Sequence, residues 1–230
     1  MANRFFVSDL PAPGEFLLDG PEAHHLAKVS RAEVGDKVVL FCGDGFDYPA
    51  TIRRIGRRAV VLDVAPGVLA QRESPTRVMI AAPLPKADRG TFMIEKLTEL
   101  GVSAYVPLIT EHSIITPGEG KTERLRRIVL EASKQCGRSV FLQIEPPQNL
   151  AAFLARPDLP TERWLAEPGA PHWQSPGPEQ DTVFLIGPEG GLTEIEVDSA
   201  KTAGFRLVGL GPRILRVETA ALALAALTLA

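Results

Sequence analysis

The chain has 230 residues, of which 45% are apolar, and its formal net charge is −3. This length predicts one large domain or two modest ones, with ample apolar material for a core. The charge excludes a wholesale basic nucleic-acid binder, so any contact with RNA or DNA must come from local basic patches.

Residues 1–72 are predicted to form a small β-rich domain. Short apolar or alternating runs, separated by glycine turns such as the one at 43–45, are typical of strands. The expected strands are 4–7, 15–18, 37–41, 48–55 and 59–64. One helix is expected at 21–30, with Pro21 in its first turn. Small barrels of this type often bind oligonucleotides, and the polar stretch 71–76 is the expected linker.

From residue 73 to residue 230, strands and helices are predicted to alternate. The expected strands are 78–82, 104–109, 140–144, 163–166, 183–186 and 205–208. The expected helices are 89–100, 122–136, 149–155, 193–204 and a terminal helix, with Asn149 as one cap and Thr193 with Glu196 as a capping box. This alternation predicts an α/β domain with a mostly parallel sheet and helices on both faces.

Two glycine turns directly follow predicted strands. The first reads LIGPEGGL at 185–192, and the second starts the stretch GLGPRILRVE at 209–218. An uncharged helix rich in alanine and leucine follows, and an apolar terminus of this kind must be packed inside the structure. Open α/β sheets bind ligands at the carboxyl ends of their strands, so the two turns predict a ligand pocket.

Several familiar sites are excluded by their spacing. Ile115 occupies the position where a P-loop needs its opening glycine, and Ile214 the position of the third glycine of a dinucleotide fingerprint. The histidines and cysteines have no metal-ligand spacing. No serine-hydrolase elbow is present. We therefore expect no metal and no hydrolytic site.

The ends and the cysteines of the chain predict a cytoplasmic protein with no membrane partner. Cys42 and Cys136 are too few for a disulfide framework. The N-terminus lacks the apolar core and cleavage site of a secretory signal. The uncharged C-terminal run begins only at Thr219, too late to provide the roughly 20 residues that span a bilayer.

Two arginine clusters interrupt the otherwise balanced charge. One lies at 53–58 in the β-rich domain and the other at 124–127 on the second helix of the α/β domain. Each cluster alone is equally compatible with a solvated face. Together, on two domains, they favour a track for a phosphate backbone.

The motifs LIGPEGGLTEIEV (185–197) and LGPRILRVETAALA (210–223) resemble those of the SPOUT methyltransferases. Within that superfamily the chain is similar to the RsmE family, the uridine-N3 methyltransferases of small-subunit ribosomal RNA. Further matches are RFF at 4–6, HHLAKVSR at 24–31, EKLTELGV at 95–102 and EASKQCGR at 131–138. The resemblance implies a PUA-like β-barrel domain at 1–72, a trefoil-knotted SPOUT domain at 73–230, S-adenosylmethionine as methyl donor, ribosomal RNA as partner, and a homodimer.

The resemblance also implies which residues carry the function. The cofactor would be held by Leu185, Ile186, Gly187, Glu189, Gly190, Leu210, Gly211, Ile214, Leu215 and Arg216. RNA would be bound by Arg4, His25, Arg31, Arg53, Arg54, Arg57, Arg58, Arg124 and Arg127. Arg138 and Arg216 would stabilise charge on the uracil oxygens. Glu218 would accept the N3 proton or orient Arg216, or be merely a carboxylate near a helix N-terminus.

Two other functions remain open from the sequence. One is a SPOUT methyltransferase for another nucleotide of ribosomal or transfer RNA. The other is a non-catalytic RNA-binding factor of ribosome assembly. Binding of S-adenosylmethionine distinguishes the second from an enzyme.

Overall fold

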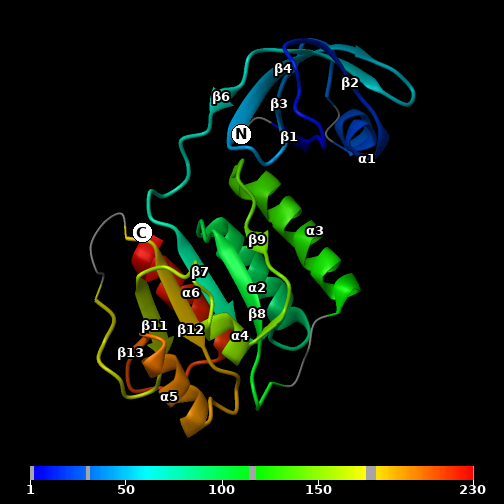
Figure 1. Cartoon of the computed structure of the whole chain (residues 1–230). Helices are drawn as coiled ribbons and strands as arrows, with labels where there is room; N and C mark the ends of the chain where they lie inside the picture. Colours follow the sequence, from blue (N-terminus) through cyan, green and yellow to red (C-terminus); the bar gives the residue numbers. More distant parts are fainter. Residues whose placement is uncertain (1–2, 30–31, 114–117, 175–179, 230) are drawn as a thin grey trace. The chain divides into compact units, whose positions relative to one another are not determined.

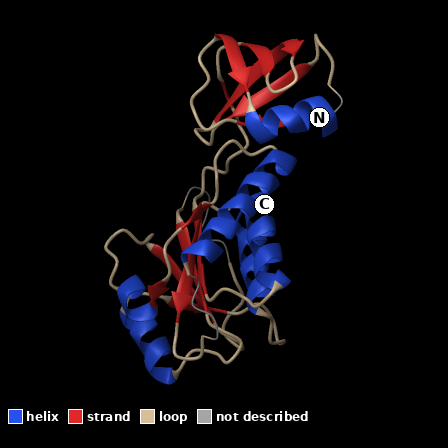
Figure 2. Cartoon of the chain, turned by 90° about the vertical axis from the view of Figure 1, so that its right-hand side faces the viewer, coloured by secondary structure: helices blue, strands red, loops and turns tan. Residues whose placement is uncertain are grey.

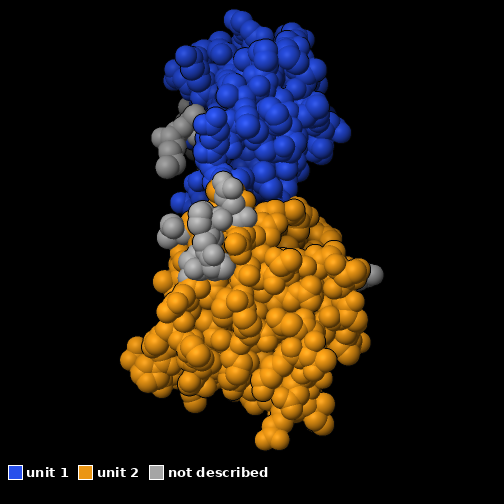
Figure 3. All heavy atoms as spheres, turned by 60° about the vertical axis from the view of Figure 1, so that its left-hand side comes forward, with its two compact units in different colours: residues 1–73, 133–141 blue, residues 74–132, 142–230 orange. Residues whose placement is uncertain are grey.

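The computed structural model describes residues 3–29, 32–113, 118–174 and 180–229 (Figure 1). The chain divides into two compact units, coloured separately in Figure 3. The first unit comprises residues 1–73 and 133–141, and the second comprises 74–132 and 142–230. The first unit therefore includes a short segment from the middle of the chain.

The first unit contains a six-stranded sheet in the order β1-β3-β4-β5-β2, with β6 paired to β4. The strands are β1 (Asn3–Phe6), β2 (Gly14–Leu18), β3 (Lys37–Phe41), β4 (Phe46–Ile55), β5 (Val60–Val64) and β6 (Val68–Leu69). β1 and β3 are parallel and the other pairs are antiparallel. The five predicted strands are thus confirmed, and the two-residue β6 was too short to leave a pattern in the sequence.

The predicted helix at 21–30 is irregular. It begins as α1 (Gly20–His24) and continues as a π-helical turn, η1 (His25–Val29), while residue 30 lies outside the described residues. Leu26 of η1 is fully buried with Phe5, Leu40 and Ile52 in the core of the unit. The sequence therefore predicted a helix here, but it gave no sign of the wider helical turn.

Polar contacts bind the segment 133–141 to the strands of the first unit. Asp47 on β4 accepts hydrogen bonds from Arg4 Nη1 (2.9 Å), Arg72 Nη2 (2.8 Å) and Ser139 Oγ (2.6 Å). Arg72 Nη1 also donates to the carbonyl of Gly137 at 3.0 Å. Both oxygens of the Asp47 carboxylate are therefore satisfied, and the segment is fixed by charge-assisted hydrogen bonds.

An aromatic cluster completes this attachment. The ring of Phe141 makes edge contacts with Phe6 and Phe41, at centroid distances of 5.8 and 5.9 Å. This packing explains why the strand predicted at 140–144 is wrong over its first part. Only β9 (Gln143–Ile144) is a strand, because Phe141 belongs to the first unit and packs there against Phe6 and Phe41.

The second unit contains a seven-stranded sheet in which every pairing is parallel. The order is β10-β8-β7-β12-β11-β13, with β9 paired to β8. The strands are β7 (Val78–Ala82), β8 (Ala104–Ile109), β9, β10 (Gln148–Asn149), β11 (Glu162–Ala166), β12 (Thr182–Ile186) and β13 (Arg206–Val208). The predicted α/β fold with a mostly parallel sheet is confirmed.

Helices cover both faces of this sheet (Figure 2). They are α2 (Asp88–Glu99), α3 (Glu119–Cys136, whose last turn belongs to the first unit), α4 (Leu150–Leu154), α5 (Glu194–Thr202) and α6 (Val217–Leu229). α4 and α5 cover one face, and α6 packs against β7 and β12 with α2 beside it. Asn149 caps α4, and Thr193 with Glu196 forms the expected capping box. Within the described residues, no helix combines the length and apolar character needed to cross a membrane.

Candidate cofactor pocket and adjoining hollow

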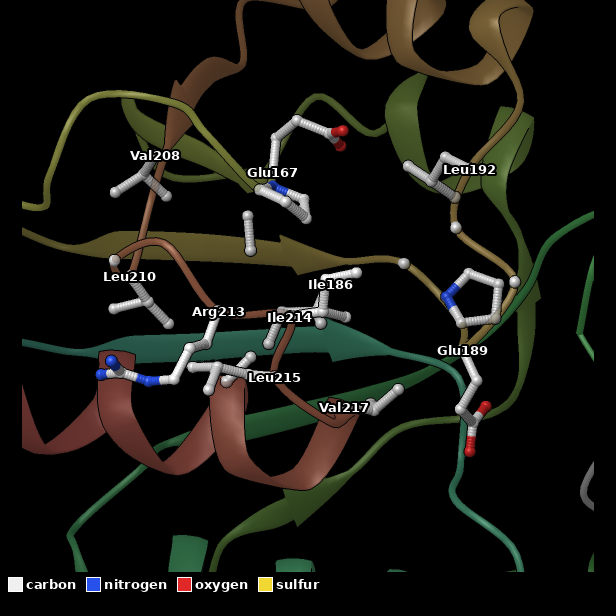
Figure 4. Close-up of a pocket in the computed structure, with 18 residues that line it drawn as sticks. Glu167, Ile186, Glu189, Leu192, Val208, Leu210, Arg213, Ile214, Leu215 and Val217 are labelled. Carbon is white, nitrogen blue, oxygen red and sulfur yellow. The ribbon is translucent and has the colours of Figure 1, made fainter.

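The second unit contains a pocket of about 330 Å³ at the carboxyl ends of β11, β12 and β13 (Figure 4). Its walls are largely apolar, and they include Ile186, Leu192, Val208, Leu210, Ile214, Leu215 and Val217. Three charged side chains also line it: Glu167, Glu189 and Arg213. A mostly apolar cavity with a few polar groups is the usual form of a small-molecule site.

The first wall of the pocket is the bend that follows β12. β12 is entirely buried, and the chain then turns at Gly191, whose φ of 74° suits glycine. Glu196 fixes the bend from two sides, because its carboxylate accepts hydrogen bonds from the backbone N–H of Thr193 and of Glu111, each at 2.9 Å. His112 Nδ1 lies 3.1 Å from the carbonyl of Gly191. The bend is therefore supported by the loop that follows β8.

The second wall is the bend that follows β13. The N–H of Gly209 donates to the carbonyl of Pro171 at 2.7 Å, and its own carbonyl accepts from the N–H of Trp173 at 3.2 Å. A Cβ atom at position 209 would lie 2.1 Å from the carbonyl oxygen of Ala170. Only glycine fits this backbone contact, and Gly211 then turns the chain with a φ of 98°.

Most of the expected cofactor residues lie around this pocket. The lining includes Ile186, Gly187, Glu189, Gly190, Leu210, Gly211, Ile214 and Leu215. Leu185 is fully buried in the core on the α4 and α5 side, and Arg216 lines an adjoining hollow instead. Glu167 and Arg213 were missed by the sequence analysis. Glu167 directly follows β11, so the rule about strand ends could have found it.

The adjoining hollow lies where α2 and α6 begin, and it measures about 600 Å³. Its lining comprises Asp88, Arg89, Phe92, Ile214, Leu215, Arg216, Glu218 and Thr219. Ile214 and Leu215 line both cavities, so the hollow shares a wall with the pocket.

Arg89 links the two cavities electrostatically. Its Nη2 lies 3.3 Å from Glu189 Oε1 in the pocket, and its Nη1 lies 3.6 Å from Glu218 Oε1 in the hollow. The Glu218 side chain is only 8% exposed, and its Oε2 has no hydrogen-bond partner among the described residues. The ion pair of Glu218 is thus made with Arg89, a residue that the sequence analysis did not single out.

The third expected catalytic residue, Arg138, belongs to the first unit. Its guanidinium is buried and forms a bidentate ion pair with Glu73. Nε donates to Oε1 at 3.0 Å, and Nη2 donates to Oε2 at 2.6 Å. Arg216 and Glu218, in contrast, both lie on the hollow of the second unit.

The expected RNA-binding residues differ in exposure. Arg53, Arg54, Arg57 and Arg58 are exposed on and beside the β4–β5 hairpin, and Arg124 and Arg127 are exposed on α3. His25 is exposed, with its ring 5.8 Å from that of Phe5. Arg4 is only 9% exposed because it pairs with Asp47, and Arg31 lies outside the described residues.

A search for metal-binding clusters gave none among the residues that the structure describes. The polar groups at the two cavities are carboxylates, guanidinium groups and the hydroxyl of Thr219, together with backbone N–H and carbonyl groups.

Both units of the chain match family models of known proteins. Residues 72–229 match the family model of the RNA methyltransferase domain, and residues 18–65 match that of the RNA methyltransferase PUA domain. These two matches define the chain as an RNA methyltransferase.

Individual proteins are similar to this chain over most of its length. Ribosomal RNA small subunit methyltransferase E of Bacillus subtilis is 32% identical over 96% of this chain and 93% of its own length. The enzyme of that name from Synechocystis is 35% identical over 86% of this chain and 67% of its own length. The crystal structure of the Neisseria gonorrhoeae enzyme of the same name, bound to S-adenosyl methionine, superposes with a TM-score of 0.89 at 29% identity, covering 98% of this chain and 96% of that one.

The chain belongs to the RNA methyltransferase family that includes ribosomal RNA small subunit methyltransferase E. The family and the enzyme class recognised from the sequence motifs are therefore confirmed.

Proposed function

We propose that this protein transfers a methyl group from S-adenosylmethionine to N3 of a uridine in small-subunit ribosomal RNA. When bound, S-adenosylmethionine supplies an electrophilic methyl group on a positively charged sulfur. The family match and the charge pattern of the pocket support this proposal. A ribosomal RNA substrate makes the cytoplasm the expected place of action.

The charges of the pocket complement those of the cofactor. S-adenosylmethionine carries a sulfonium, an ammonium and one carboxylate, so its net charge is positive. The pocket offers the carboxylates of Glu167 and Glu189 and the guanidinium of Arg213. The apolar walls and the backbone of the two bends suit an adenine ring. The residues present therefore fit this cofactor, and this complementarity is the observation that carries the proposal.

We propose that the two bends are the loops of a trefoil knot. The segment 170–173 is hydrogen-bonded to Gly209, and the chain then continues into α6, whose buried side chains include Val217, Ala221 and Leu224. Such packing keeps the pocket walls in place. Knots are otherwise almost absent from proteins.

RNA binding is assigned to the exposed basic groups of the chain. We propose that the first unit is a PUA-like barrel in the 1–72 region and that the remainder, 73–230, is the SPOUT catalytic domain. Phosphate contacts then fall to the arginines of the β4–β5 hairpin and of α3. Arg4 is left out because its guanidinium is already occupied by Asp47.

Charge stabilisation on the uracil is assigned to Arg216. Its side chain is exposed on the hollow beside the cofactor pocket. Arg138 is not retained for this role, because burial and its ion pair with Glu73 leave its guanidinium unavailable to a base. An arginine offers a planar fork of donors that keeps its charge at neutral pH.

The methylation reaction is the direct test. The purified protein, S-adenosylmethionine and small ribosomal subunits should yield 3-methyluridine, detected by mass spectrometry of the digested RNA. Arg216→Ala should lower the rate by about 10²–10³-fold, because a charge-stabilising donor is lost. The affinity of Arg216→Ala for the cofactor, measured by calorimetry, should stay unchanged. The control variant Arg77→Ala alters another exposed arginine of the second unit, and both its methylation rate and its cofactor affinity should equal those of the wild-type protein.

Three results would contradict the proposal. The absence of any heat of binding with S-adenosylmethionine would favour a non-catalytic assembly factor. A normal level of 3-methyluridine in ribosomal RNA from a deletion strain would favour another target nucleotide. A wild-type rate for Arg216→Ala would remove this residue from the reaction.

We further propose that the protein is a homodimer joined through α2 and α6. A third cavity, of about 710 Å³, runs along these helices. It is lined by apolar residues such as Leu100, Leu222, Ala223 and Ala226, and also by the charged residues Lys96 and Glu99. Leu227 on α6 is 56% exposed. Exposed apolar side chains with charged residues at their edge are typical of a surface that is covered by a partner.

Sedimentation tests the dimer. The wild-type protein should sediment as a dimer at micromolar concentration, and Leu227→Arg should sediment as a monomer because a charge would be buried at the interface. The matched control is Ile195→Arg on α5, a residue that is 79% exposed, and this variant should remain a dimer. A monomeric wild-type protein would refute the proposal.

A further inference from the structure

The hollow where α2 and α6 begin has the properties of a site for a nucleobase. We propose that it holds the uracil ring, and that Arg89, Glu218 and Arg216 bind the Watson–Crick edge of that ring. This inference rests on the proposed function, and it adds Arg89 and the basis of base selectivity.

Electrostatics favours an electron-rich ring in this position. α2 and α6 both direct their N-termini at the hollow, so two positive helix ends meet there. Arg89 and Arg216 add two guanidinium groups. Uracil that loses its N3 proton becomes an anion, and these groups would stabilise that charge.

The buried carboxylate of Glu218 is an independent sign of a missing ligand. Its side chain is more than nine-tenths buried and lines the hollow, and one oxygen is paired with Arg89. The other oxygen, Oε2, has no hydrogen-bond partner among the described residues. Buried polar atoms in native proteins nearly always have a partner. A ligand that donates a hydrogen bond would supply it.

The three side chains match the hydrogen-bonding pattern of uracil. Its Watson–Crick edge presents a carbonyl oxygen, the N3–H group and a second carbonyl oxygen, which is the order acceptor, donor, acceptor. Arginine only donates and an ionised carboxylate only accepts. The two arginines and Glu218, which line the same hollow, therefore supply the complementary groups. Cytosine would set its amino group against an arginine and its N3 lone pair against the carboxylate. Such mismatches reject the wrong base strongly, because buried polar groups stay unpaired.

The local structure around Arg89 supports a binding role. Ala87 has a φ of 53° and is the only described residue other than glycine with a positive φ. Strained backbone of this kind is concentrated at functional sites. This conformation places Asp88 and Arg89 at the mouth of the hollow. One turn further along α2, the half-exposed ring of Phe92 offers a surface on which a base can stack.

The methyl transfer needs only the uracil ring, the Glu218 carboxylate and the methyl donor. The N3 proton of uracil passes to the Glu218 carboxylate, and the N3 electron pair forms the bond to the methyl carbon. The bond between that carbon and sulfur breaks with its pair on sulfur, so the products are 3-methyluridine and S-adenosylhomocysteine. Glu218 then releases the proton to solvent.

Glu218→Gln tests the proton acceptor. The variant should lose about 10²–10⁴-fold in kcat, the usual contribution of general base catalysis. Its rate should rise with pH, because only RNA that has already lost the N3 proton reacts. Transcribed RNA containing 5-fluorouridine, whose N3 proton is more acidic, should restore much of the rate when it is assembled into small subunits. The control Glu194→Gln, an exposed residue on α5, should behave like the wild-type protein on both RNAs.

Arg89→Lys tests the binding of the base. Lysine keeps the positive charge but lacks the planar group that donates two parallel hydrogen bonds. The value of kcat/KM should therefore fall by about 10²-fold or more, while calorimetry still shows cofactor binding. Wild-type kinetics for Arg89→Lys, or a loss in Glu218→Gln that neither pH nor 5-fluorouridine relieves, would overturn this inference. If the wild-type protein binds no S-adenosylmethionine or makes no 3-methyluridine, the proposed function itself fails, so the two failures are distinguishable.

Discussion

Each unit contains a largely buried carboxylate, and the two differ in how many hydrogen-bond partners they have. Asp47 in the first unit is 15% exposed and accepts three hydrogen bonds, from Arg4, Arg72 and Ser139. Glu218 in the second unit is 8% exposed, has one ion pair at 3.6 Å and leaves one oxygen without a partner among the described residues. The first carboxylate has partners for both of its oxygens, and the second has one oxygen that could accept a hydrogen bond from the ligand proposed above.

The contrast follows from the cost of burying charge. A buried ion pair contributes little net stability compared with an apolar replacement, but removal of one partner leaves an expensive isolated charge. At Asp47 that charge would be Arg4, whose side chain is only 9% exposed. At Glu218 the structure already tolerates an unsatisfied oxygen, so loss of its charge should cost the fold little.

The largest expected effect on stability is therefore that of Asp47→Asn. It should lower the free energy of unfolding by about 3 kcal/mol, because Arg4 and Arg72 lose their counter-charge. Glu218→Gln should change the same quantity by less than about 1 kcal/mol, since an amide fills the same space. Urea unfolding followed by circular dichroism measures both. Equal losses in the two variants would remove the distinction between the two carboxylates.

Asp47 should also make the stability of the protein depend on pH in the acid range, and this effect should be smaller. Burial alone would raise the pKa of Asp47, but hydrogen bonds from Arg72, Ser139 and Arg4 outweigh burial and lower this pKa below its ordinary value of 3.8. A carboxyl group with a lowered folded-state pKa stabilises the protein fully above its unfolded-state pKa. This stability is lost as the pH falls through the folded-state pKa.

Urea unfolding at a series of pH values between 6 and about 2 measures this loss. The wild-type protein should lose stability in the acid range, and Asp47→Asn should lose less. Hydrogen bonds also lower the pKa of Asp44 against the opposing effect of burial, so both proteins share a background slope. The difference between the two curves isolates Asp47. Parallel curves would show that its network contributes no pH dependence.

Much of the fold was predictable because its signals are local. The alternation of apolar strands with amphipathic helices predicted a parallel sheet, and the capping residues Asn149 and Thr193 marked two helix starts correctly. The segment 140–144 was misjudged for a reason that is not local. Its apolar residues suit a strand equally well, but Phe141 finds aromatic partners in Phe6 and Phe41 far earlier in the chain.

The sequence by itself determined the family and the two bends that line the candidate cofactor pocket. Glycine is the only residue that fits against the carbonyl of Ala170 at position 209 or turns easily at 191 and 211, so backbone geometry was visible in the residue types. Only the tertiary structure showed that Arg89 bridges Glu189 and Glu218, and that Arg138 is held by Glu73. Ion pairs join side chains that are distant along the chain, and folding, not local spacing, brings them together.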